Sequence, residues 1–140
     1  MRTANQQLLM TWFDEVWNKG RREAIAEILG PGFVMRDGDR QVEGVDGFEA
    51  FFDQIRSAFS GIAISVDCMV GESDTVCARW TASQRHTGAG MGVQPTGREF
   101  QIPGITIVRV ENGKFVEAWQ NWDALKMMQE IGALGRAAGA

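Results

Sequence analysis

His86 is the only histidine in the 140-residue chain, and its side chain is the one best suited to accept a proton near neutral pH. An imidazole has an unperturbed pKa of about 6.5, so modest changes in its surroundings switch its protonation state. Such a group could take the acidic proton of a methylene beside a carbonyl. The alternative is a structural role, in which His86 ends a strand and bonds to a neighbouring carbonyl.

The residues that precede His86 alternate in character. Even-numbered residues from Val76 to Ala82 are apolar, whereas odd-numbered residues from Arg79 to Arg85 are polar or charged. Successive side chains of a strand point to opposite faces, so Gln84 and His86 should continue the apolar face. The sequence therefore places an amide and a proton acceptor at the end of a row of core residues.

Two carboxylates near the end of the chain have structural explanations. Asp123 stands where a helix is expected to begin, and an aspartate there accepts hydrogen bonds from free backbone N–H groups as an N-cap. Glu117 shares a strand face with Trp119, and we expect it to pair across strands with Arg109 or Arg79. Neither carboxylate is therefore predicted to be catalytic.

The two cysteines, Cys68 and Cys77, fall on different strand candidates. This spacing fits neither a metal site nor a disulfide framework, so we expect two buried thiols. Histidine and cysteine are the usual zinc ligands, and a single histidine beside two separated cysteines predicts no metal site. We also expect no cofactor, because the sequence contains no flavin signature.

The composition narrows the class of protein. A net charge of −4 with mixed acidic and basic residues leaves no basic stripe that could follow a phosphate backbone, so nucleic acid is not an expected partner. The polar N-terminus contains no apolar run, which predicts no signal peptide, no membrane span and a cytoplasmic location. A chain of this length buries about 68–70% of its unfolded surface. We expect one domain over residues 1–140, with 135–140 as a loose tail.

Two helices are predicted before the first strand. Apolar residues at helical spacing mark residues 8–17, and Asn18-Lys19-Gly20 closes this helix. A short helix over residues 21–29 should stop at Gly30-Pro31-Gly32, because glycine and proline interrupt helices.

Two further helices follow. Apolar residues from Val45 to Phe59 return to helical spacing, and Asp46 with Glu49 has the spacing of a capping pair. The last helix begins at Asp123.

The remaining segments read as strands joined by turns. Asp37-Gly38-Asp39 is a turn signal between two short strands, and Pro103-Gly104 marks a bulge or bend inside a long one, because proline cannot donate to a strand ladder. The element order predicts an α+β fold with helices on one side of an antiparallel sheet. The predicted strands span residues 33–35, 40–43, 62–70, 74–87, 98–110 and 114–122.

Several motifs resemble those of the SnoaL-like polyketide cyclases, a family of the NTF2-like superfamily. The resemblance covers nearly the whole chain and implies a cone, in which a curved antiparallel sheet is wrapped by three helices of the N-terminal half and a C-terminal helix. The motifs are Arg85-His86-Thr87-Gly88, Pro95-Thr96-Gly97-Arg98, Glu111-Asn112-Gly113-Lys114, and Glu117-Ala118-Trp119 with Asp123.

The resemblance also implies a site. The aspartate that serves as general acid/base in these cyclases falls on Gln120, and the histidine that assists it falls on Thr106. An amide has no proton to shuttle near neutral pH. His86 matches a histidine of the wider family, so we expect His86 to take the proton while Gln120 and Thr106 hydrogen-bond the enolate oxygen.

A cone of this kind should hold an apolar ligand. Large side chains that could line its pocket are equally typical of a protein core, and in a cone closed by a helix they can serve as both. The candidates for substrate binding are Trp12, Phe13, Met35, Phe48, Phe52 and Trp80.

The first functional hypothesis is cofactor-independent aldol-type cyclisation or enolisation of a hydrophobic, carbonyl-containing small molecule. The alternative is a non-catalytic ligand-binding or assembly module, because Gln120 and Thr106 depart from the family's acid/base pair. A hydroxylase-like relative with a redox partner would share the fold. We also expect a homodimer through an apolar outer face of the sheet, formed by Ile105, Ile107, Phe115 and Trp119.

Overall fold

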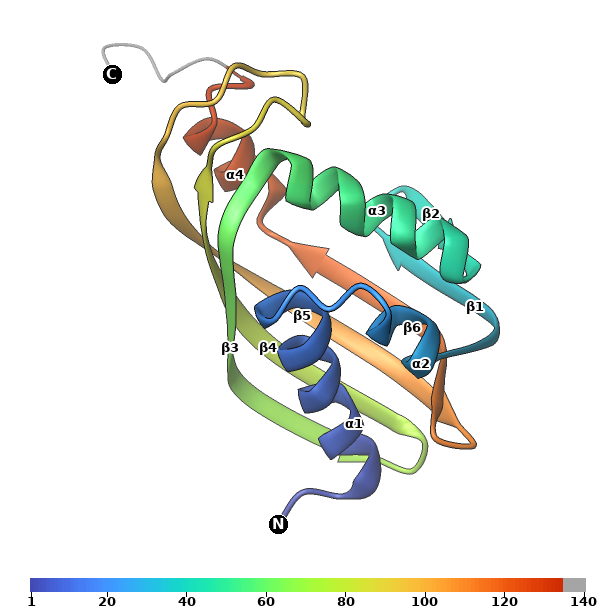
Figure 1. Ribbon diagram of the computed structural model, residues 1–140. Coiled ribbons are helices and arrows are strands. Elements are labelled where there is room, and N and C mark those ends of the chain that lie inside the picture. Colours follow the sequence, from blue (N-terminus) through green and yellow to red (C-terminus); the bar gives the residue numbers. More distant parts are fainter. Residues whose placement is uncertain (135–140) are drawn as a thin grey trace.

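The computed structural model describes residues 1–134, which form a curved six-stranded sheet with helices on its concave side (Figure 1). The strands lie in the order β2-β1-β6-β5-β4-β3. The helices are α1 (Ala4–Trp12), η1 (Phe13–Asn18), α2 (Ala24–Ile28), α3 (Gly44–Ala58) and α4 (Ala124–Glu130). The strands are β1 (Leu29–Asp37), β2 (Arg40–Glu43), β3 (Phe59–Glu72), β4 (Thr75–His86), β5 (Glu99–Glu111) and β6 (Lys114–Trp122).

The predicted α+β cone is confirmed. Helices α1, α2 and α3 come from the N-terminal half and cover the sheet, and α4 follows β6 at the other end (Figure 1). One feature of the sheet was not predicted: β1 runs parallel to β6, whereas every other neighbouring pair is antiparallel. The predicted tail, residues 135–140, lies outside the described residues.

The first helix begins earlier than expected and changes its winding. Thr3 and Gln6 form a capping box, in which Thr3 Oγ1 accepts from the Gln6 N–H at 3.1 Å and Gln6 Oε1 accepts from the Thr3 N–H at 3.0 Å. From Phe13 the helix widens into the π-helix η1, a form that often marks functional sites. Phe13 and Trp17 of η1 are buried against the sheet.

Asn18, at the end of η1, is bound to the edge strand β3. Its Nδ2 donates to the Ile64 carbonyl at 3.1 Å, and its Oδ1 accepts from the Ile64 N–H at 2.6 Å. These backbone groups would otherwise be unpaired, because β3 has a neighbouring strand on one side only. The side chain therefore fixes the π-helix over the sheet.

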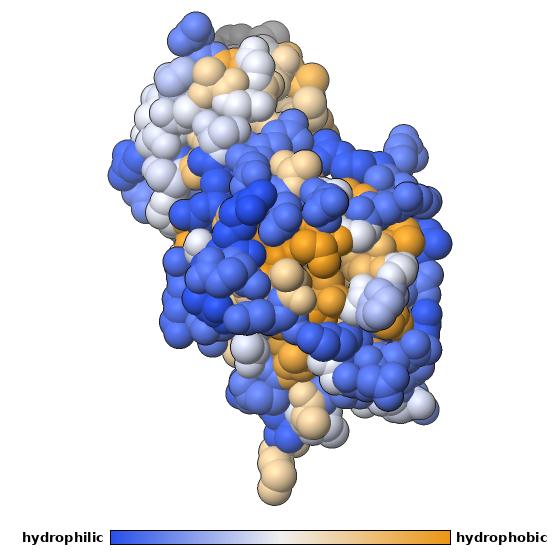
Figure 2. All heavy atoms as spheres, turned by 45° about the vertical axis from the view of Figure 1, so that its right-hand side comes forward, coloured by the Kyte–Doolittle hydropathy of each residue, from blue (hydrophilic) through white to orange (hydrophobic). Residues whose placement is uncertain are grey.

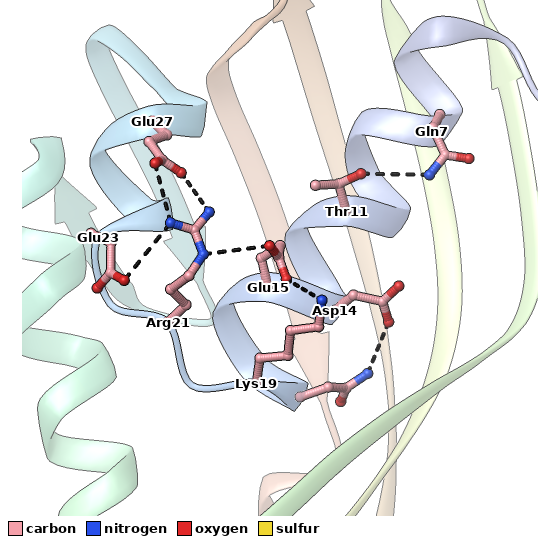
Figure 3. Close-up of polar contacts among 9 residues, drawn as sticks. Gln7, Thr11, Asp14, Glu15, Lys19, Arg21, Glu23 and Glu27 are labelled. Carbon is pink, nitrogen blue, oxygen red and sulfur yellow. Dashed lines mark hydrogen bonds and ion pairs between the residues drawn. The ribbon is translucent and has the colours of Figure 1, made fainter.

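Charged side chains surround the turn from η1 to α2 (Figure 3). Arg21 contacts Glu27 at 2.6 Å and Glu15 at 3.4 Å, and Glu15 also pairs with Lys19 at 2.8 Å. Exposed ion pairs contribute only about 0–1 kcal/mol each. This network therefore orients the turn more than it stabilises the fold.

The capping pair predicted for α3 does not form. The helix begins at Gly44, so Asp46 lies within its first turn, and no side chain caps its N-terminus. Glu49 is directed instead to Arg22, whose Nη1 donates to Glu49 Oε2 at 3.4 Å. A tertiary ion pair has thus replaced the local contact that the spacing suggested.

The second helix stops as predicted, since α2 ends at Ile28, but the expected strand start at Phe33 is wrong, because Gly30-Pro31-Gly32 already belong to β1. The pairing of β1 with β6 is irregular between Leu29 and Val34. Glycine and proline here interrupt the ladder without ending the strand, as they do at bulges.

Cys68 and Cys77 are not both buried: Cys68 is exposed and Cys77 is half-buried. The cause is an irregularity in β3, where Val66 pairs with Trp80 but Cys68 pairs with Arg79, which leaves Asp67 as an extra residue. An extra residue reverses the alternation beyond it, so Cys68 moves from the concave face to the convex one.

A second bulge corrects the predicted outer face. Arg109 pairs with Glu117 and Val110 with Phe115, so Val116 is the extra residue. Phe115 consequently turns onto the concave face and is 1% exposed. The convex face retains Ile105, which is 44% exposed, with the partly buried Ile107 and Trp119. The dimer through this face stays a prediction.

Pro103-Gly104 does not form the expected bulge, because the pairing of β4 with β5 is continuous through both residues. Gly104 is required for another reason. It lies opposite Trp80, and a Cβ atom on residue 104 would overlap the Trp80 indole. Pairing between β5 and β6 ends at Gly104, where the Asp123 N–H donates to the Pro103 carbonyl at 3.1 Å.

The predicted start of the last helix is confirmed. Asp123 Oδ1 accepts from the Lys126 N–H at 3.0 Å and caps α4. In residues 1–134 no helix has the length and apolar character needed to cross a membrane.

Replacing Gly104 with alanine should lower the free energy of unfolding by about 1–3 kcal/mol, because the added methyl overpacks the Trp80 indole. Gly47→Ala is the matched control: Gly47 lies inside α3 with room for a Cβ, so alanine should stabilise the protein by roughly 0.5–1 kcal/mol. Urea denaturation measures both. A neutral Gly104→Ala would show that the indole is free to move.

Candidate functional site

A cavity of about 80 Å³ lies between the concave face of the sheet and the elements η1, α3 and α4. Its wall contains two amides, Gln84 and Gln120, and is otherwise aromatic and aliphatic. Apolar surface also lies open in the middle of the face seen in Figure 2, framed by hydrophilic side chains. The aromatic residues of the wall are Phe13, Trp17, Phe51, Phe59, Trp80 and Trp122.

The structure divides the predicted pocket residues into two groups. Phe13 and Trp80 line the cavity. The other four are buried in the adjoining core and do not line it; they are Trp12, Met35, Phe48 and Phe52. Phe51 and Ile55 of α3 and Trp17 of η1 take their place. Helical spacing identified apolar residues but not which of them meets the cavity rather than the core.

Thr106 and Gln120 are brought together, as register partners on β5 and β6. Trp80 Nε1 donates to Thr106 Oγ1 at 2.9 Å, and Thr106 Oγ1 donates to Gln120 Oε1 at 3.2 Å. The hydroxyl has one proton, and Gln120 receives it. Thr106 is 4% exposed, so its function in this arrangement is to orient the Gln120 amide.

Asp37 is a site residue that no pattern in the sequence indicated. It is the last residue of β1 and pairs in register with Gln120 across the parallel β1–β6 pair. The Trp122 indole N–H donates to both carboxylate oxygens, at 2.9 and 3.2 Å. The sequence suggested only a turn at Asp37, because a parallel pairing leaves no local signal.

Burial raises the pKa of Asp37 above its ordinary value. Hydrogen bonds from Trp122 and Gln120 and the positive charge of Arg40 act in the opposite direction, but burial is the larger effect. Asp37 does not itself line the cavity, but its register partner Gln120 and its hydrogen-bond donor Trp122 do. A carboxyl whose proton affinity is raised next to a cavity is a candidate acid/base group.

His86 faces the interior, as predicted, and is fully buried. Its Nδ1 accepts the Thr96 backbone N–H at 3.1 Å, so a neutral ring carries its proton on Nε2. Nε2 has no hydrogen-bond partner among residues 1–134. His86 does not line the cavity, although its neighbour Gln84 does. The hydrogen bond from Thr96 fixes the segment that follows β4 to the last residue of that strand. The role of His86 as proton acceptor stays a prediction.

Glu117 has the structural role that was predicted. It pairs with Arg109 at 3.2 Å, as expected, and with Arg36 at 2.6 Å. The hydrogen bond from Arg36 is the main reason that the pKa of Glu117 lies below its ordinary value. Arg36 also lies over the Trp119 ring at 5.9 Å, so this carboxylate belongs to the convex face rather than to the cavity.

No group of three or more His, Cys, Asp or Glu side chains that could hold a metal ion occurs within the part of the chain that the structure describes. The cavity wall itself contains no charged side chain in that part of the chain. The arrangement is suited to orienting an uncharged ligand through amide hydrogen bonds.

A family model described as SnoaL-like polyketide cyclase matches residues 7–131. The chain belongs to the SnoaL-like polyketide cyclase family. The match includes Trp80, Thr106, Gln120 and Asp37. A search of the curated proteins found no match.

Solved structures of similar fold support this membership. A suggested SnoaL-like polyketide cyclase from Jannaschia sp. CCS1 is 26% identical with a TM-score of 0.86, covering 95% of this chain and 97% of that one. TsrD from Streptomyces laurentii is 28% identical, with a TM-score of 0.81 and coverage of 95% and 98%. AclR from Streptomyces galilaeus, a suggested hydroxylase, is 26% identical, with a TM-score of 0.85 and coverage of 95% and 83%.

Asp37→Asn should flatten the pH dependence of stability. The raised pKa of Asp37 means that the folded chain binds more protons than the unfolded chain just above pH ~3.9. The free energy of unfolding of the natural protein should therefore fall as pH rises through that window. We expect Asp37→Asn to avoid this loss, because an amide does not titrate in this range.

Denaturation at a series of pH values between 3 and 7 measures the effect. Asp39→Asn, at an exposed site two residues away, serves as the control and should follow the natural protein. A natural protein that gains stability over Asp37→Asn as pH rises would contradict the assignment.

Proposed function

We propose that this protein binds a hydrophobic, carbonyl-containing small molecule in the cavity and catalyses a cofactor-independent aldol-type cyclisation or enolisation. The observation that carries the proposal is the oriented Gln120 amide in an otherwise apolar wall, with the Asp37 carboxyl on the neighbouring strand. Family membership supports the reaction class. The substrate itself is an expectation from this chemistry.

Gln120 acts as the donor to the substrate oxygen. Its Oε1 is occupied by Thr106, so its amide N–H groups are available to Asp37 and to a carbonyl in the cavity. A fixed donor placed where negative charge develops stabilises an enolate more than the starting ketone. An amide cannot transfer a proton, so another group must accept it.

Asp37 acts as that acceptor in the proposal. Its carboxylate takes a proton from the methylene beside the carbonyl, and the C–H electron pair forms the enolate. The enolate carbon attacks a second carbonyl of the same substrate, and the protonated Asp37 returns its proton to the new alkoxide. Asp37 is hydrogen-bonded to Trp122 and does not line the cavity, so the proposal requires the indole to shift when substrate binds.

The alternative is a non-catalytic ligand-binding module of the same fold. Two observations favour it: the cavity is small compared with the roughly 300–1,000 Å³ of typical ligand sites, and its wall has an amide where these cyclases have an acid. Binding without turnover would be the signature of this function.

Turnover of aromatic 1,3-diketones with a second ketone in the chain tests the proposal, with loss of the diketone absorbance and the product mass as readouts. Asp37→Asn should reduce the rate by about 10²–10⁴-fold, because the general base is lost. Gln120→Leu should reduce kcat by about 10²–10³-fold through loss of the enolate donor. The exposed Asp39→Asn control should retain the natural rate.

A comparison with His86→Gln identifies the base. If His86→Gln abolishes turnover and Asp37→Asn does not, the proton acceptor is His86, as the sequence suggested. Tight binding of the diketones with no product from the natural protein would instead support the binding module.

A further inference from the structure

Gln84 is a buried polar residue in the cavity wall that the proposed reaction does not use. It is 6% exposed and lies on the concave face of β4. Its Nε2 donates to the Phe100 carbonyl over a long 3.4 Å, and its amide oxygen accepts no hydrogen bond from residues 1–134. This oxygen is not among the fully enclosed unpartnered atoms of the described residues, so it stays accessible, and its lack of a donor requires an explanation.

The cavity provides that explanation. Gln84 forms part of its wall, where the neighbouring residues Ala82 and Ile102 are apolar and offer no hydrogen. A donor for the Gln84 oxygen must therefore come from water or from a ligand inside the cavity. The hydrogen bond to Phe100 holds the amide nitrogen toward β5, so the oxygen is the free end.

Gln84 and Gln120 present opposite halves of the amide. Gln84 has its nitrogen occupied and its oxygen free, whereas Gln120 has its oxygen occupied by Thr106 and its nitrogen available. Gln84 pairs with Phe100, and Gln120 pairs with Thr106, six residues further along β5. At about 3.3 Å per residue their backbones are at most roughly 20 Å apart along the strand, and the two side-chain ends are closer on this curved sheet, because both line the same cavity.

We infer that Gln84 determines ligand specificity by accepting a hydrogen bond from a hydroxyl group at the far end of the ligand from its carbonyl. The ligand class is an elongated, uncharged molecule with an apolar middle, a carbonyl at the Gln120 end and a hydroxyl at the Gln84 end. This inference rests on the proposed function for the carbonyl at Gln120. Carboxylate ligands are disfavoured, because the described wall offers no positive charge to offset burial.

Two rigid probes test the inference by calorimetry with the full-length protein: 4-acetyl-4′-hydroxybiphenyl and 4-acetylbiphenyl, which lacks the hydroxyl. We expect the hydroxyl to increase affinity for the natural protein about tenfold. Gln84→Leu should remove that gain and leave the affinity for 4-acetylbiphenyl unchanged. Gln101→Leu is the matched control, because Gln101 is exposed on the adjacent strand, and both probes should bind it as they bind the natural protein.

Equal affinity of the two probes for the natural protein would overturn the inference. An equal loss of affinity for both probes in Gln84→Leu would overturn it as well. Gln84→Met gives the same comparison if Gln84→Leu does not fold. Hydroxyl-dependent binding without turnover of any diketone would support the inference while refuting catalysis. If neither ketone binds, the inference and the proposed function both fail.

Discussion

The contact between the Trp80 indole and Gly104 is the constraint on which the site depends. The missing side chain at Gly104 lets the indole lie across β5, and from there its N–H reaches Thr106. Thr106 accepts from Trp80, so its single hydroxyl proton is donated to Gln120 Oε1. This hydrogen bond determines that the amide nitrogen of Gln120 is the end available to the cavity. A packing requirement on one strand thus determines the hydrogen-bonding character of another. The same indole also forms part of the cavity wall, so shape and polarity there are coupled.

The parts of the fold that depend on neighbouring residues and simple alternation could be predicted. The concave face of β4 through Gln84 and His86, the cap at Asp123 and the pairing of Glu117 with Arg109 all agree with the sequence analysis. Each follows from a two-residue period, a helix terminus or an antiparallel neighbour, and these are properties that a short stretch of chain specifies. Family motifs extended that prediction to the whole cone.

The rest could not be predicted, because its causes lie in contacts between distant segments. Single extra residues at Asp67 and Val116 reverse the faces of two strands, and they exposed Cys68 and buried Phe115 against expectation. The parallel pairing of β1 with β6 brought Asp37 beside Gln120, although more than eighty positions separate them in the chain. For the site, the sequence identified Gln120 and Thr106 by resemblance, but not their connection to Trp80 and Asp37.

The polar groups of the cavity wall are two carboxamides, which carry no charge and do not titrate. An acid in the place of Gln120 would make the occupancy of the cavity follow the acidity of the surroundings, whereas two glutamines keep the same hydrogen-bonding pattern at any acidity that a cell experiences. Asp37, which neighbours Gln120 but does not line the cavity, is a carboxyl whose pKa burial raises. The carboxyl and the cavity wall are nevertheless coupled, because Gln120 and Trp122 of the wall both hydrogen-bond Asp37 and lower its pKa, so a change at either wall residue also changes the proton affinity of the carboxyl.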